Sequence, residues 1–194
     1  MRLNTFTPIS YRLLIQPLDY QYDFLEEIGR KSMEIYYPRI RGFKVLSMKF
    51  LPEHVLIKPQ SLLAKFIMGD KSMIHLSDLY KLIEADWKHN LEEISLFILP
   101  HSIIGLGYDV TGFYLGCNLS IVSTYSFKEK HLRQSCIGVS LHEIGHTLGL
   151  KHCKINNCLM KTPCKPKNFH KGIYRLCEEH KNQVLMFNKK YGNC

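Results

Sequence analysis

Three histidines and a glutamate in the stretch SLHEIGHTLGLKHC have the spacing of a metal site. His142 and His146 are four residues apart, so on a helix their imidazoles lie on one face, one turn above the other. Glu143 lies about 100° away around the helix, within reach of a water molecule held by the pair. Gly149 lets the chain leave the helix in a left-handed conformation, and the turn brings His152 back as a third ligand. This pattern predicts a zinc site.

The donor set predicts the chemistry of that site. Three nitrogen ligands with an open fourth position are typical of catalytic zinc, which lowers the pKa of a bound water to about 7 and polarises a carbonyl group. Glu143 is expected to take the proton of the water and pass it to the leaving amine. The reaction class that this set favours is peptide hydrolysis. The alternative, a surface helix that carries these residues by accident, requires Gly149 and His152 to be accidents too.

A second cluster of metal-binding residue types follows directly. Cys153 and Cys158 enclose a four-residue spacer, and Cys177 and His180 are three residues apart on a predicted final helix. Three sulfurs and one nitrogen close a tetrahedral zinc shell, which is the pattern of a structural site. A group of free cysteines without a metal is the alternative. Two further cysteines could replace one of these ligands: Cys164 and, less easily, Cys194.

Together these residues resemble the archaemetzincins, a family of metzincin-like metalloproteases. The family signature is HExxHxxGxxHC-x4-C-x-M, and the segment HEIGHTLGLKHCKINNCLM matches it at every fixed position. The resemblance implies a methionine turn at Met160 beneath a catalytic zinc, with Glu143 as the base. It also implies two zinc ions, one catalytic and one structural. The catalytic ligands are then His142, His146 and His152.

The resemblance further implies a sheet whose edge strand holds an extended peptide through main-chain hydrogen bonds. Residues 113–124 are expected to form that edge. The chain departs from the family at one position of the second site. There the family has a Cys-x-x-Cys pair, whereas this chain has Cys177 followed by His180. Histidine is an acceptable zinc ligand, so the second site is expected to persist with three cysteines and one histidine.

Length and periodicity predict the fold. The 194 residues suffice for one core, and alternating strand-like and helix-like segments favour an α/β sheet. Together with the resemblance, this gives a single compact metzincin-like domain with a twisted mixed sheet and an active-site helix. A short cysteine-rich C-terminal subdomain, residues 150–194, follows an N-terminal subdomain of residues 1–149.

Apolar spacing locates the remaining elements. Strands are predicted at residues 12–18, 42–51, 54–57 and 94–99, and residues 113–127 are predicted to form one long strand or two short ones. Further helices are predicted at residues 20–36, 78–90 and 174–191. The short segment 54–57 is expected to pair with the strand before it.

The net charge of +9 is concentrated near the C-terminus. Residues 1–150 carry 16 basic and 15 acidic side chains, whereas residues 151–194 carry 10 and 2. A second hypothesis is therefore a zinc-stabilised binding module whose basic lobe contacts an acidic partner or nucleic acid. Glu143 argues against it, since a structural site needs no base, and the lysines lack interleaved aromatic residues. A third hypothesis is a family member without detectable peptidase activity.

Composition also bounds location and partners. No apolar run approaches the roughly 18 residues of a membrane span, and the N-terminus lacks the features of a signal peptide. Seven cysteines, an odd number, favour metal binding in a reducing cytosol over disulfides. We therefore expect a cytoplasmic protein with no membrane partner. Its substrate is expected to be a peptide or an unfolded protein segment. Cleavage preference, exo- or endopeptidase action and oligomeric state are not encoded in any recognisable motif.

Overall fold

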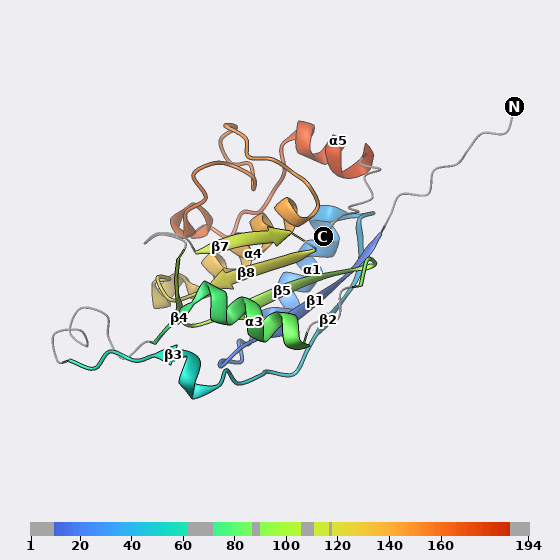
Figure 1. The fold of residues 1–194 in the computed structure, drawn as a ribbon. Coiled ribbons are helices and arrows are strands. Elements are labelled where there is room, and N and C mark those ends of the chain that lie inside the picture. Colours follow the sequence, from blue (N-terminus) through green and yellow to red (C-terminus); the bar gives the residue numbers. More distant parts are fainter. Residues whose placement is uncertain (1–9, 62–71, 87–89, 106–110, 117, 187–194) are drawn as a thin grey trace, which may run out of the picture.

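A computed structural model describes residues 10–61, 72–86, 90–105, 111–116 and 118–186 (Figure 1). The strands are β1 (Tyr11–Pro17), β2 (Ile40–Val45), β3 (Leu56–Ile57), β4 (Met73–His75), β5 (Glu93–Leu99), β6 (Ser102–Ile104), β7 (Gly112–Gly116) and β8 (Leu119–Ser123). The α-helices are α1 (Leu25–Tyr36), α3 (Leu76–Asp86), α4 (Leu132–Thr147) and α5 (Glu178–Met186). Short 3-10 turns are η1 (Glu53–Val55), η2 (Glu129–His131) and η3 (Pro166–Phe169).

The centre of the molecule is a five-stranded sheet in the order β2-β1-β5-β8-β7. Its strands run parallel except for β7, which is antiparallel to β8 and lies at one edge. A smaller sheet has the order β3-β4-β6. The predicted α/β class with a mixed sheet is thus confirmed. No helix in the described part of the chain is long and apolar enough to cross a membrane.

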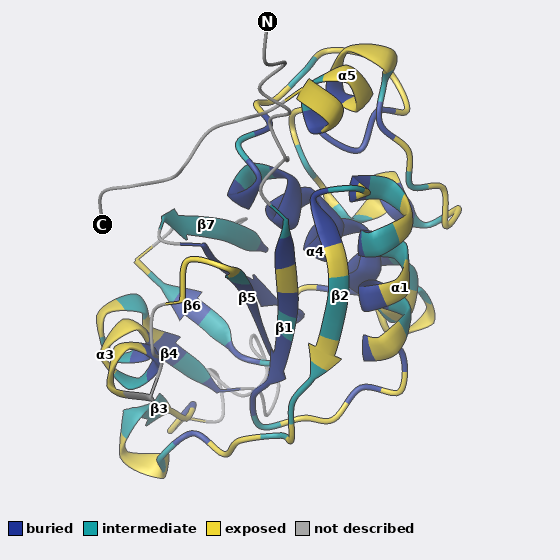
Figure 2. Ribbon diagram, turned by 90° about the vertical axis from the view of Figure 1, so that its right-hand side faces the viewer, coloured by how far each residue is buried: buried dark blue, intermediate teal, exposed yellow. Residues whose placement is uncertain are grey.

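Two apolar cores lie on the two faces of the large sheet. On β5, Ile94, Leu96 and Ile98 point to the core formed with α1 and α4. Phe97 and Leu99 point to the opposite core, which includes α3. Both faces of the central strand are therefore covered, which explains why its sequence is an almost continuous apolar run. Figure 2 shows α1 and α4 on one side of the sheet and α3 with the small sheet on the other.

Several predicted boundaries need correction. The first helix begins at Leu25 and not at residue 20, because Tyr22 is buried and its hydroxyl lies 2.7 Å from that of Thr124, which holds this stretch against the end of β8. The second strand ends at Val45, with only an isolated bridge from Lys49 to Leu18 beyond it.

Two further corrections concern the small sheet and the last helix. Of the predicted strand at residues 54–57, only Leu56 and Ile57 form a strand, and they pair with β4 and not with the strand before them, whereas His54 and Val55 belong to η1. The final helix begins at Glu178, and its expected end at residue 191 lies outside the described residues.

Candidate active site and metal centres

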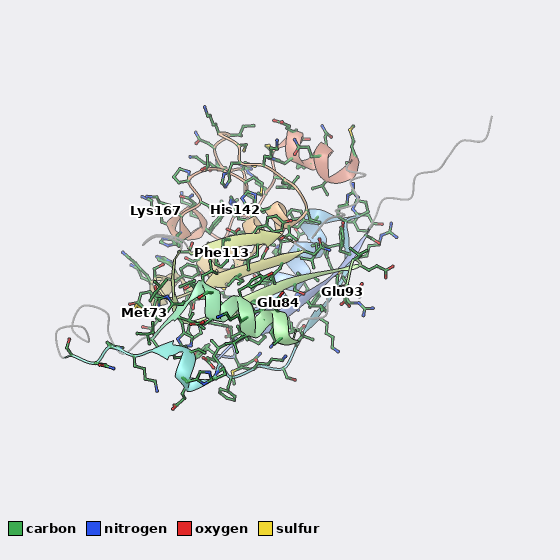
Figure 3. All side chains as sticks on the ribbon, viewed as in Figure 1. Met73, Glu84, Glu93, Phe113, His142 and Lys167 are labelled. Atoms are coloured by element: carbon green, nitrogen blue, oxygen red, sulfur yellow. The ribbon has the colours of Figure 1, made fainter. Side chains whose placement is uncertain are left out.

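Helix α4 carries the first two histidines to the edge of the sheet that ends in β7. The helix packs on β5, β7 and β8 of the sheet, on α1 and on η3. Residues 135–145 are all buried, so the helix has no broad solvent face. Figure 3 shows His142 between β7, marked by Phe113, and the C-terminal segment, residues 150–186. The site therefore lies where the sheet ends and this segment begins.

The three histidines converge as predicted. The Nε2 atom of His146 lies 3.0 Å from that of His142 and 3.0 Å from that of His152, and the remaining pair is 3.3 Å apart. Three nitrogens bound to one zinc ion in a tetrahedral shell lie about 3.4 Å from one another, given Zn–N distances near 2.1 Å. The donor type and the spacing thus both fit a zinc ion.

Main-chain carbonyls orient two of these rings. Nδ1 of His142 lies 2.7 Å from the carbonyl oxygen of Leu159, and Nδ1 of His146 lies 2.9 Å from that of Leu150. Each Nδ1–H donates to its carbonyl, which leaves the Nε2 lone pair free for a metal. Burial lowers the pKa of His142 to about 4, so its ring stays neutral well into the acid range.

Gly149 makes the turn that returns His152 to the site. Its φ angle is +87°, in the left-handed region that favours glycine. The helix end is closed by hydrogen bonds from the amide of Gly149 to the carbonyl of His146 and from the amide of Leu150 to that of Gly145. The sequence-based role of this glycine is confirmed by its conformation.

Glu143 is buried beside the histidines, with 5% of its surface exposed. Its carbonyl accepts hydrogen bonds from the hydroxyls of Ser120 and Thr147, at 3.2 and 3.0 Å, which fix the backbone of this turn to β8. Burial raises the pKa of its carboxyl group to about 8 when no cation is nearby. A carboxyl group in such a dry site can hold and release a proton near neutral pH.

Met160 lies directly under this part of α4. The residue is fully buried, and a side chain at Gly145 would place its Cβ atom 2.5 Å from the Met160 sulfur. The same Cβ atom would also lie 2.9 Å from the hydroxyl of Tyr36, which donates a hydrogen bond to the carbonyl of Leu141. Gly145 therefore lets the methionine and the tyrosine reach the helix backbone between the first two histidines.

The second cluster assembles from the four predicted residues. The ligand atoms of Cys153, Cys158, Cys177 and His180 all lie within 4.8 Å of one another. Nδ1 of His180 lies 3.4 Å from the sulfur of Cys158 and 3.2 Å from that of Cys177. Three sulfurs and one nitrogen at these separations suit a closed tetrahedral zinc shell. Cys164 is not part of this group, and Cys194 lies outside the described residues.

The open edge of the sheet is shorter than predicted. Of residues 113–124, those in β8 pair with β5 on one side and β7 on the other, so within this range the edge of the sheet is formed by residues of β7. The amide of Ser123 donates to the carbonyl of Thr111, and Gly112 lies opposite Val122. Because hydrogen-bonded and non-hydrogen-bonded pairs alternate in antiparallel strands, the main-chain groups of Gly112 and Tyr114 point to the open edge.

The sequence analysis missed several residues that support the site. Gly112, Gly145 and Leu159 act through backbone position or lack of a side chain, and they carry no chemical signal of their own. Ser120 and Thr147 are ordinary hydroxyl residues until the fold brings both to the carbonyl of Glu143.

Known proteins have a similar fold. Residues 102–184 match the model of peptidase family M54. The archaemetzincin of Methanopyrus kandleri has a similar structure with a TM-score of 0.63, 18% identity, and coverage of 91% of this chain and 94% of that one. The archaemetzincin of Archaeoglobus fulgidus has a TM-score of 0.60 and 20% identity, with 89% of this chain and 99% of that one covered. A zinc-dependent peptidase of Methanocorpusculum labreanum has a TM-score of 0.58 and 17% identity, with 88% of this chain and 99% of that one covered. No curated protein matches the chain.

Fold, site and family match define a zinc metalloprotease. The residues matched by the model of peptidase family M54, 102–184, include both groups of candidate metal ligands, and this match confirms the resemblance to the archaemetzincins.

Proposed function

We propose that the protein hydrolyses peptide bonds with a catalytic zinc on His142, His146 and His152 and with Glu143 as the general base. The observation that supports this most directly is the convergence of three Nε2 atoms to within 3.0–3.3 Å. Zinc bound there would polarise the scissile carbonyl and make water more acidic. The substrate class follows from the peptidase family.

Residues of the chain transfer the proton, orient the histidine rings and bind the peptide. A carboxylate oxygen of Glu143 accepts a proton from the attacking water and then donates it to the nitrogen of the leaving amine. The carbonyls of Leu159 and Leu150 keep the rings of His142 and His146 in one tautomer throughout. An extended peptide binds along β7 through the outward main-chain groups of Gly112 and Tyr114, which contribute affinity with little side-chain preference.

The cluster of Cys153, Cys158, Cys177 and His180 holds a second, structural zinc in this proposal. Its four ligands leave no open position, and they join the loop after α4 to the start of α5. Two zinc ions per chain follow. Because thiolate ligands need a reducing environment, we also propose that the protein works in the cytosol.

Substitution of the proposed base tests the function. Glu143→Gln should keep zinc bound and lower the rate of cleavage of a fluorogenic peptide library by about 10²- to 10⁴-fold, the usual contribution of a general base. Glu53→Gln is the matched control, because Glu53 lies in η1 and its side chain is 89% exposed. Zinc content by elemental analysis accompanies each rate. Undiminished cleavage by Glu143→Gln would rule out the proposed mechanism.

A further inference from the structure

Gly112 is the residue of the edge strand that lies directly against Glu143. It is the first residue of β7, and the hydrogen bond from Ser123 to Thr111 ties the chain to β8 just before it. A Cβ atom at position 112 would lie 2.8 Å from Cγ and 2.9 Å from Oε1 of Glu143. It would also lie 2.9 Å from a methyl group of Val139 on the same helix. Real Cβ atoms do not approach other atoms so closely, so only glycine fits here without a shift.

The surroundings leave the glutamate side chain as the group that must yield. The helix backbone at Glu143 is held through its carbonyl by Ser120 and Thr147. Val139 is fully buried. On the other side, β7 is held by its pairing with β8. A side chain at position 112 therefore pushes the carboxyl group of Glu143 aside.

The same residue also faces the substrate. The alternation of hydrogen-bonded pairs turns the N–H and C=O groups of Gly112 to the open edge, where the proposed peptide lies. Gly112 thus meets the proposed peptide through its main chain and the proposed base through its bare α-carbon. The contact of Gly112 with Glu143 therefore helps to set the distance between the base and the peptide.

The geometry points to Gly112 as a positioning residue for peptide hydrolysis: the absence of a side chain keeps the carboxyl group of Glu143 at its working distance from a peptide on β7. This inference rests on the proposed function and adds a residue that acts through the base. Misplacement of a reacting group by about 1 Å costs roughly 10²-fold in rate. The effect belongs in kcat, because the main-chain groups that bind the peptide are still present.

The experiment compares the zinc-loaded wild type with Gly112→Ala and a control, Gly42→Ala. Gly42 lies in β2 at the opposite edge of the sheet, and a Cβ atom there would meet nothing within 4 Å. We expect Gly112→Ala to keep its zinc and fold, to lose about 10²-fold in kcat, and to change KM by less than about threefold. Gly42→Ala should match the wild type.

A kcat within about twofold of the wild type, or a loss that appears only in KM, would overturn the inference. If Gly112→Ala loses zinc or fails to fold, the double variant Gly112→Ala/Val139→Ala is measured in its place and judged by the same changes in kcat and KM. This variant removes the close contact with the methyl group of Val139. Loss of zinc or of folding in both variants would show a purely structural glycine and would also overturn the inference. A wild type without zinc-dependent cleavage would contradict the proposed function itself, whereas an active wild type with an equally active Gly112→Ala contradicts the inference alone.

Discussion

The packing of the C-terminal segment on α4 can be tested at Gly138. In the middle of this helix, a Cβ atom at position 138 would lie 2.5 Å from both Cβ and Cδ1 of Phe169 and even closer to Cγ. Phe169 ends η3, is 5% exposed and belongs to the core shared by the sheet, α1 and α4. An overlap with the base of an aromatic ring is not relieved by a small shift. Gly138→Ala must therefore displace Phe169.

Two opposing effects set the magnitude. Replacing glycine by alanine inside a helix stabilises the folded state by up to about 1 kcal/mol. Overpacking a close-packed core costs about 1–3 kcal/mol, and displacement of a ring places this case near the upper end. We therefore expect Gly138→Ala to lower the free energy of unfolding by about 2 kcal/mol. For a chain of this size the melting temperature should fall by about 4–8 °C.

A double-mutant cycle on the zinc-loaded protein, followed by urea unfolding and circular dichroism, checks the reasoning. Phe169→Ala alone should cost about 3–5 kcal/mol. In that background the overlap with Cγ and Cδ1 is gone and only the contact of 2.5 Å with the Cβ atom of residue 169 is left, so the added Gly138→Ala should cost clearly less than about 2 kcal/mol. The cost of Gly138→Ala thus falls when the ring is removed. Gly138→Ala that stabilises the wild type, or that destabilises both backgrounds equally, would refute the packing described for η3 and α4.

Two further outcomes are expected. His180→Ala should reduce the zinc content from two ions to one per chain by elemental analysis, and His180→Cys should restore two; unchanged content in His180→Ala would remove this histidine from the second cluster. Burial raises the pKa of Cys136 to about 12, so its thiol stays protonated at pH 8. Cys136 should therefore not react with iodoacetamide in the folded protein but should react after denaturation, and peptide mapping detects the labelled cysteine. Rapid labelling of folded protein at Cys136 would contradict its placement in the core.

The convergence of the candidate metal ligands could be predicted from the sequence because their geometry is local. Histidines four residues apart on a helix, followed by a glycine turn, need little tertiary information to converge, and His152 is only six residues beyond His146. The second cluster also followed from residue type, although the choice between His180 and Cys164 needed the fold.

The edge of the sheet could not be predicted in the same way. Whether a strand is an edge or an interior strand depends on its partners, and β8 receives β5 from a part of the chain more than twenty residues away. Apolar spacing is the same in both cases. The roles of Gly112 and Gly138 are similarly non-local, because each depends on a side chain about thirty residues distant that fills the space the glycine leaves.

The three residues Cys158, Leu159 and Met160 lie between the two groups of candidate metal ligands found among the described residues. Cys158 supplies a sulfur to the cysteine cluster, the carbonyl of Leu159 orients His142, and the side chain of Met160 packs beneath α4. The amide of Leu159 is in turn anchored to the carbonyl of Arg175, two residues before Cys177. One short peptide thus connects the two groups of candidate metal ligands, so a substitution that displaces its backbone would disturb both groups at once.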